Sequence, residues 1–227
     1  MIKNLSFLIF GVLLWSSSFV LAQVKIIGLE PSDDNWLTKR DSGFLKVMGL
    51  TYKKPVDFDE INGTECFKFN PQLEEILTCA NHQLYSKDRQ FMTFFITQQL
   101  DESNENDRSI IAYIGKENID KRHISRIKYE IWQSIGKEAV PKWKQYAQYY
   151  PAEDAKSKFN ADSAITAAIK LKPEYPYYKG KYNHLKSFYL QKKGRGFVVF
   201  YCFYTDEAEK NLPFYWKAIE GVFRFDD

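Results

Sequence analysis

Three cysteines and three histidines carry most of the metal-binding and nucleophilic chemistry that this chain of 227 residues could perform. Cys66 and Cys79 lie 13 positions apart, and Cys202 lies far downstream in an aromatic stretch. A disulfide between Cys66 and Cys79 would close a short loop and stabilise the fold by about 3 kcal/mol, although three buried free thiols would also fit the sequence. The histidines lack ligand spacing and no C-x2-C pair is present, so the sequence predicts no metal.

Nucleophilic catalysis has one candidate arrangement, Cys202 with His184, which fall on two predicted neighbouring strands. A reactive thiolate needs an exposed, electropositive environment, whereas Cys202 stands among apolar residues. The chain also lacks the G-x-S-x-G, H-E-x-x-H, P-loop and G-x-G-x-x-G motifs. The sequence therefore favours a non-enzymatic protein without a cofactor, and a cell-envelope hydrolase with an unrecognised site is the alternative.

Two segments could instead bind a ligand. The turn from Lys192 to Gly196 combines three cations with two glycines, which suits either an anion site or a solvated hairpin tip. The tyrosine-rich tract before His184 could stack on sugar rings or fill a partner's pocket, or else cover a sheet face. The predicted binding surface consists of Tyr175, Tyr177, Tyr178, Tyr182, Lys192, Lys193 and Arg195.

The last third of the chain has the clearest strand patterns. Runs 183–190 and 197–204 flank the glycine-containing turn and predict a hairpin. The second run is apolar on both faces, so it is predicted as a central strand. Further strands are predicted at 44–52, 91–98, 109–115 and 164–171, with 91–98 and 109–115 forming a hairpin with a charged tip.

Helices are predicted from capping residues and hydrophobic spacing. One begins at Asn70-Pro71 and extends to about Ala80. A second covers 120–135, where isoleucines 124, 127, 131 and 135, joined by Trp132, form one buried stripe. Lys121, Arg126, Lys128 and Glu130 lie off this stripe. A third starts at Pro141 and extends to about Tyr149, and a closing helix covers 213–220. The third is predicted to face the core, with an aromatic surface patch as the alternative, formed by Trp143, Tyr146, Tyr149 and Tyr150. This order predicts an α+β fold, a mostly antiparallel β-sheet packed against helices in one sandwich-like domain.

Composition and targeting signals indicate the compartment. Hydrophobic residues make up 44% and charged residues 27%, and the net charge of +3 shows no nucleic-acid or membrane-surface footprint. Residues 1–22 have a basic start, an apolar run and a small-residue cleavage site, which predict a signal peptide. An uncleaved anchor is the alternative, although serines 16–18 interrupt the apolar run. The domain at 23–227 is thus predicted to be exported, periplasmic or extracellular, and not stably inserted in the membrane after signal removal.

The C-terminal motifs also resemble known proteins. The hairpin, the acidic turn and the closing helix ending in IEGVFRF (219–225) resemble the C-terminal half of PsbP-like domains in architecture. FNADS (159–163), KGKY (179–182) and QKKGRGF (191–197) resemble uncharacterised exported proteins of Bacteroidetes-type bacteria. The PsbP-like resemblance implies an accessory or scaffold role and transfers no functional residue. We therefore expect an exported, non-enzymatic binding or accessory protein whose partner is an unknown envelope protein or small molecule, with a structural envelope protein as a further alternative.

Overall fold

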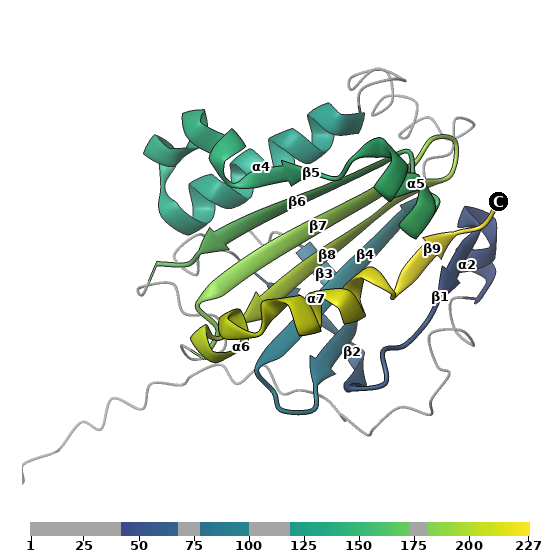
Figure 1. Cartoon of the computed structure of the whole chain (residues 1–227), viewed down its shortest axis with the longest axis horizontal. Helices are drawn as coiled ribbons and strands as arrows, with labels where there is room; N and C mark the ends of the chain where they lie inside the picture. Colours follow the sequence, from purple (N-terminus) through teal and green to yellow (C-terminus); the bar gives the residue numbers. More distant parts are fainter. Residues whose placement is uncertain (1–41, 68–77, 100–118, 173–180) are drawn as a thin grey trace, which may run out of the picture.

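The computed structural model describes residues 42–67, 78–99, 119–172 and 181–227, which form helices packed on an antiparallel sheet (Figure 1). This arrangement confirms the predicted α+β class. In chain order the elements are α2 (Ser42–Met48), β1 (Leu50–Tyr52), β2 (Phe58–Phe67), β3 (Thr78–Ser86), β4 (Phe91–Gln99), α4 (Ile119–Ile135), the 3-10 helix η1 (Lys137–Gln145), β5 (Ala147–Tyr149), α5 (Ala152–Phe159), β6 (Ser163–Lys170), β7 (His184–Lys192), β8 (Gly196–Tyr204), α6 (Asp206–Lys210), α7 (Leu212–Glu220) and β9 (Phe223–Phe225).

Seven strands form the main sheet in the order β2-β3-β4-β8-β7-β6-β5, and β1 pairs separately with β9. Every residue of β8 is buried, as its two apolar faces predict for a central strand. The β7–β8 hairpin runs in register from His184 opposite Tyr204 to Lys192 opposite Gly196. Gly194 and Gly196 have φ angles of 72° and 139°, which only glycine adopts without strain, so the turn needs both glycines.

Alternating side chains divide the core into two halves, one on each face of the sheet. Phe188 and Phe200 point into the first half, which α5, α7 and β9 cover. Tyr189 and Tyr201 point into the second, which α4 and η1 cover. Figure 1 shows α7 crossing one face of the sheet, while α4 and η1 lie beyond β5 and β6. No helix among the described residues is long and apolar enough to span a bilayer.

The segment 44–52 was predicted as one strand, and this prediction is wrong. Residues 42–48 form α2, and only Leu50–Tyr52 forms a strand. Leu45 and Met48 are both buried and lie three positions apart, which is the spacing of one helical face. Gly49 then adopts a φ of 57° and ends the helix.

Local signals also misled the prediction around 70–80 and 141–149. Most of the helix predicted from Asn70 to about Ala80 lies outside the described residues, as does the strand predicted at 109–115. The last residues of that predicted helix, 78–80, instead belong to strand β3 (Thr78–Ser86), which pairs with β2. Pro141 lies inside η1, which begins at Lys137 and has a kink at Lys142. Residues 147–149, which were predicted to belong to the same helix, form β5. After Pro151 the chain forms α5, where Glu153 and Asp154 occupy the first turn near the positive end of the helix dipole.

Candidate functional site

Helix α4 buries polar side chains against the sheet as well as isoleucines. Ile127 and Ile131 are fully buried, as the predicted stripe requires. The prediction that Glu130 lies off this stripe is wrong, because its side chain is completely buried as well. The other buried polar residues of this helix are His123, Gln133 and Ser134. Polar groups therefore determine how α4 sits on the sheet.

Glu130 accepts hydrogen bonds from two strand residues. The Ser187 hydroxyl donates to one carboxylate oxygen over 2.7 Å, and the Tyr189 hydroxyl donates to the other. One turn earlier on α4, Arg126 donates from Nε to the Tyr201 hydroxyl over 2.9 Å, and its guanidinium carbon lies 5.8 Å from that ring's centroid. These contacts attach α4 to β7 and β8 at two successive turns.

The protonation of this cluster follows from its burial. Burial raises the pKa of Glu130 from 4.5 to about 7, although the hydrogen bonds from Tyr189 and Ser187 and the charge of Arg126 oppose the rise. Burial, followed by the charge of Glu130, raises the pKa values of Tyr189 and Tyr201 above their ordinary range. Both tyrosines therefore remain protonated and Tyr189 keeps donating to Glu130, while the Glu130 carboxyl titrates near neutral pH.

The outer side of α4 carries a different set of side chains. Trp132 was predicted to join the buried stripe, and this prediction is wrong, because the residue is 46% exposed. Its ring meets the Tyr129 ring edge-on at 5.6 Å between centroids. Trp143 of η1 lies beside this helix, with Nζ of Lys128 at 5.6 Å and Nζ of Lys144 at 6.0 Å from its ring centroid. We call the five residues Lys128, Tyr129, Trp132, Trp143 and Lys144 the α4–η1 surface.

A glycine and a backbone hydrogen bond hold η1 beside α4. Gly136 has a φ of 119° and ends α4, and a Cβ at this position would collide with the Glu138 carboxylate. At the other end of η1, the Tyr146 carbonyl accepts a hydrogen bond from the Ala168 amide of β6 over 3.0 Å. The chain reversal between α4 and η1 therefore depends on Gly136, and the residue that follows η1 is hydrogen-bonded to the main sheet.

The aromatic patch predicted around 143–150 is divided between the two core halves. Trp143 and Tyr146 pack partly against the second core half, and Tyr149 is 45% exposed on β5. Tyr150 belongs to the first core half, where it donates to Glu220 over 2.5 Å and accepts from Trp216 Nε1 over 2.9 Å. These four residues therefore do not form one patch, although Trp143 joins the α4–η1 surface.

The predicted tyrosine surface is only partly described. Residues 175, 177 and 178 lie outside the described residues. Tyr182 is 2% exposed, packs in the second core half, and donates its hydroxyl to the Arg89 carbonyl over 3.1 Å. A buried ring of this kind does not fit an exposed binding surface, so the prediction needs correction for Tyr182.

The basic tip between β7 and β8 contacts acidic and carbonyl groups of the same chain. Lys192 Nζ donates to the Asp226 carbonyl over 2.9 Å, and the Lys193 amide donates to the Asp162 carboxylate over 2.6 Å. Arg195 packs so closely on Gly49 that a Cβ there would lie 2.6 Å from its Nη1. Anion binding by Lys192, Lys193 and Arg195 remains a prediction, and these contacts compete with it.

The cysteines have different surroundings. Cys66 and Cys79 occupy opposite positions in the β2–β3 ladder, a backbone register that favours the predicted disulfide. Cys202 is buried, and its thiol lies 3.4 Å from the Thr93 hydroxyl. Burial raises the pKa of this thiol to about 12. The thiol contacts Thr93 and the His184 Nε2 contacts Asp206, so Cys202 and His184 do not form a nucleophile–base pair.

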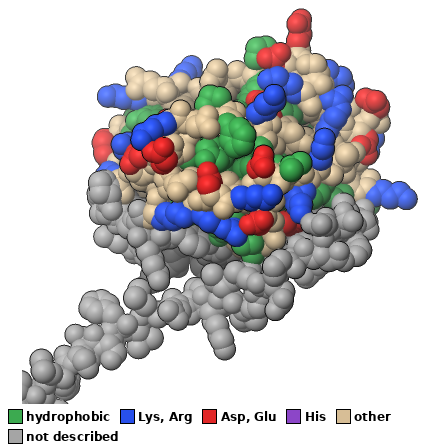
Figure 2. Space-filling model, turned by 60° about the horizontal axis from the view of Figure 1, so that its bottom comes forward, with side chains coloured by type: hydrophobic (Ala, Val, Ile, Leu, Met, Phe, Trp, Pro, Cys, Tyr) green, Lys and Arg blue, Asp and Glu red, His purple; other side chains and the backbone are tan. Residues whose placement is uncertain are grey.

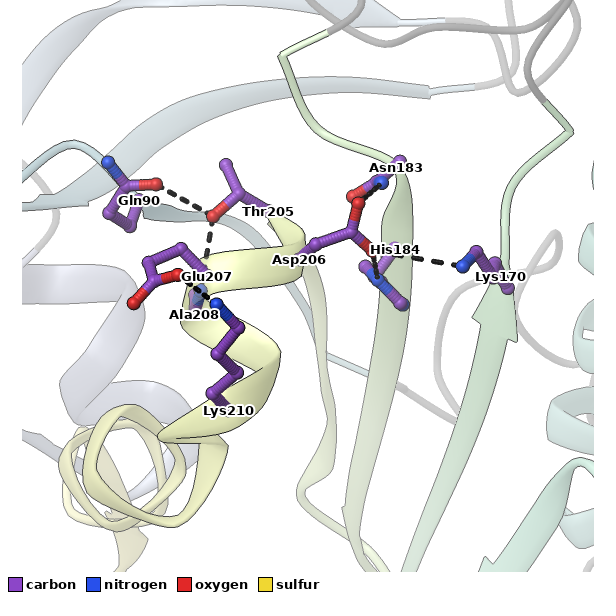
Figure 3. Close-up of polar contacts among 9 residues, drawn as sticks. All are labelled: Gln90, Lys170, Asn183, His184, Thr205, Asp206, Glu207, Ala208 and Lys210. Carbon is purple, nitrogen blue, oxygen red and sulfur yellow. Dashed lines mark hydrogen bonds and ion pairs between the residues drawn. The ribbon is translucent and has the colours of Figure 1, made fainter.

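His184 instead contacts Asp206 at the end of the sheet (Figure 3). Its Nε2 lies 2.8 Å from Asp206 Oδ1, and the Asn183 amide donates to Oδ2 over 2.5 Å. These two hydrogen bonds lower the pKa of Asp206. In Ser-His-Asp hydrolases the carboxylate is buried behind the histidine, whereas here the imidazole is 11% exposed and the carboxylate 65% exposed. The pair therefore attaches α6 to the sheet.

Thr205 completes this attachment as the N-cap of α6. Its hydroxyl accepts from the Ala208 amide over 3.1 Å and donates to the Gln90 side-chain oxygen over 2.7 Å (Figure 3). An N-cap hydroxyl satisfies a helix amide that would otherwise lack a partner. Within the part of the chain that the structure describes, no group of three or more His, Cys, Asp or Glu could hold a metal ion.

A solved structure aligns with this chain at low similarity. The solution structure of cyanobacterial PsbP (CyanoP) from Synechocystis sp. PCC 6803 aligns with a TM-score of 0.37 and 8% sequence identity, covering 79% of this chain and 94% of that chain. A similarity of this size carries no argument about fold or function. No family model and no curated protein matches the chain, so the resemblance to exported Bacteroidetes-type proteins gains no support here.

Proposed function

We propose that the protein is an exported, non-enzymatic binding protein that contacts its partner through the α4–η1 surface. The observation that carries this proposal is the exposed Trp132, whose ring meets that of Tyr129. Lys128, one helical turn earlier, reaches the Trp143 ring of η1. Tryptophan is enriched among the residues that contribute most to binding energy. A large ring exposed to water gains free energy when a partner covers it.

The buried cluster on the inner side of α4 supports this role. Glu130 and Arg126 each connect the helix to the sheet, so the outer side chains stand on an element with a fixed position. A surface that is already ordered loses less conformational entropy on binding. The inner cluster thus acts by positioning the surface.

The reactive groups of the described residues also favour binding over catalysis. Cys202 is buried with a raised pKa, and Glu130 is completely enclosed, so a substrate would have no route to its carboxyl. The features of residues 1–22 support export, which would place the partner in the cell envelope or outside the cell.

A second exposed hydrophobic region offers a matched control. Figure 2 shows hydrophobic side chains among charged ones of both signs on the side that faces down in Figure 1, where α6 and α7 lie. Phe214 of α7 is 51% exposed, about as much as Trp132. The Phe214→Ala variant therefore removes a similar exposed ring from a different side.

A thermal-shift screen of residues 23–227 against envelope sugars, peptides, lipids and divalent metals tests the proposal. A ligand at 100 times its dissociation constant stabilises by about 2.7 kcal/mol, or roughly 5–10 °C for a chain of this size. We expect Trp132→Ala to lose most of the shift that a hit produces and Phe214→Ala to keep it. An undiminished shift in Trp132→Ala, or its loss in Phe214→Ala alone, would contradict the proposed surface.

A further inference from the structure

We infer that the ligand of the α4–η1 surface is an acidic polysaccharide built from uronic acid units, an inference that rests on the proposed function. Such a ligand combines two features in each repeat, an apolar ring face and a carboxylate. The surface combines the two complementary features, aromatic rings and ammonium groups.

The charge of this region indicates an anionic partner. Lys137, Lys142 and Lys144 of η1 are exposed, Lys128 of α4 is partly exposed, and Glu138 is the one acid of η1. Within the described residues, no carboxylate forms an ion pair with any of these lysines. Four cations against one anion leave a local charge of +3, which attracts anions and speeds their association.

The position of the lysines relative to the rings indicates a sugar acid. The apolar C–H face of a pyranose ring can cover an aromatic ring, which buries apolar area on both partners. Lys128 and Lys144 hold their ammonium groups 5.6 Å and 6.0 Å from the centre of the Trp143 ring. Because these ammonium groups already lie over Trp143, a sugar would stack on the exposed Trp132 ring instead. Trp132 lies one helical turn after Lys128, so a carboxylate on that sugar comes within reach of the Lys128 ammonium group. A neutral sugar would offer these cations no opposite charge.

Other polyanions fit this surface less well. Nucleic-acid-binding domains are strongly basic, whereas this chain has a net charge of only +3. Binding in the membrane interface needs a broad apolar helix face. On the outer side of α4, Trp132 is the one strongly exposed large hydrophobic side chain among the described residues, and Ser125 nearby is exposed as well.

Binding to polygalacturonate, measured by affinity electrophoresis and calorimetry on the full exported chain, tests the inference. Neutral galactan, a single-stranded oligodeoxynucleotide and phosphatidylglycerol vesicles are the competing probes. We expect polygalacturonate to bind more tightly than galactan and its affinity to fall as salt is raised from 50 to 200 mM, since counterions screen the lysines (about 10 Å Debye length at 0.1 M). We expect Trp132→Ala and Lys144→Glu each to weaken binding by about tenfold, which corresponds to about 1.4 kcal/mol.

Phe214→Ala and Lys217→Glu on α7 are the matched controls, because both replace exposed side chains, and we expect them to bind like the wild type. Thermal melts of all four variants check that each remains folded. Equal binding of galactan, preference for the oligonucleotide or the vesicles, or no binding to polygalacturonate would overturn the uronate inference. If one of the competing probes binds and Trp132→Ala weakens that binding, the proposed surface stands. Unchanged polygalacturonate binding in both Trp132→Ala and Lys144→Glu would overturn the surface as well.

Discussion

We expect the Glu130→Gln variant to be more stable than the wild type at pH 8 and about equally stable at pH 4.5. Burial raises the pKa of Glu130 in the folded protein to about 7, against 4.5 for an exposed carboxyl. Below pH 4.5 the group is protonated in both folded and unfolded chains. As the pH rises towards 7, the unfolded chain ionises first, so the folded wild type loses relative stability. Above pH 7 this loss is complete, at about 3 kcal/mol.

The amide of the variant reproduces the protonated carboxyl. Neutral Glu130 and the glutamine that replaces it each present one accepting oxygen and one donating group to the Ser187 and Tyr189 hydroxyls, which can accept as well as donate. The difference in unfolding free energy between variant and wild type should therefore grow by about 3 kcal/mol from pH 4.5 to 8, or roughly 6–12 °C in Tm.

Urea titrations and calorimetry at a series of pH values measure this difference. Glu153→Gln, an exposed change on α5, is the control and should show little pH-dependent difference from the wild type. If the Glu130→Gln difference stayed constant across this range, the carboxyl would ionise like an exposed one and the buried cluster would be refuted.

The second large effect concerns the two cysteines in the β2–β3 ladder. We expect Cys66 and Cys79 to be disulfide-bonded in the exported protein. Directly opposite residues on antiparallel strands have Cα atoms about 4.5–5.5 Å apart, which falls within the range of about 4.4–6.8 Å that disulfides need. Cys66 lies opposite Cys79 in the register. Closing this loop should stabilise the protein by about 3 kcal/mol, so reduction should lower Tm by roughly 6–12 °C.

Alkylation of the unfolded protein without reductant, followed by mass spectrometry, counts the free thiols. Only Cys202 should be labelled, and in the folded protein burial should protect it as well. A Cys66→Ser, Cys79→Ser double variant should melt like the reduced wild type. Three labelled cysteines in the unfolded, unreduced protein would contradict the disulfide.

The elements that were predicted correctly have their determinants close together in the sequence. The β7–β8 hairpin needs its glycine turn and two apolar runs, and all of these lie within 183–204. The end of α4 needs only the isoleucine stripe and Gly136. By contrast, the paired segments of β2 and β3 are DEINGTEC and CANHQLY. Their polar residues interrupt the alternation of apolar and polar positions that predicts a strand. Asn70-Pro71, which lies between the two segments, predicts the start of a helix instead.

The inner side of the candidate site could not be predicted for a related reason. The two hydroxyls that hold Glu130 lie 57 and 59 residues downstream, so local spacing assigned this carboxylate to solvent. The outer side was predicted only through Trp143, because the position of Lys128 beside η1 depends on the reversal at Gly136. Trp132 was assigned to the buried stripe because it lies one position after Ile131 in the sequence. Tyr182 was assigned to a surface because its core partners are distant in sequence.

Chemical-shift mapping of the isotope-labelled protein during titration with trigalacturonate locates the binding site residue by residue. We expect the largest amide changes on residues 128–132 of α4 and 143–145 of η1. The indole N–H signals of Trp132 and Trp143 should move with the same saturation curve. Changes confined to the β7–β8 tip at 192–196 or to α6 and α7 would contradict the α4–η1 surface as the binding site, and no changes at saturating ligand would contradict the uronate ligand.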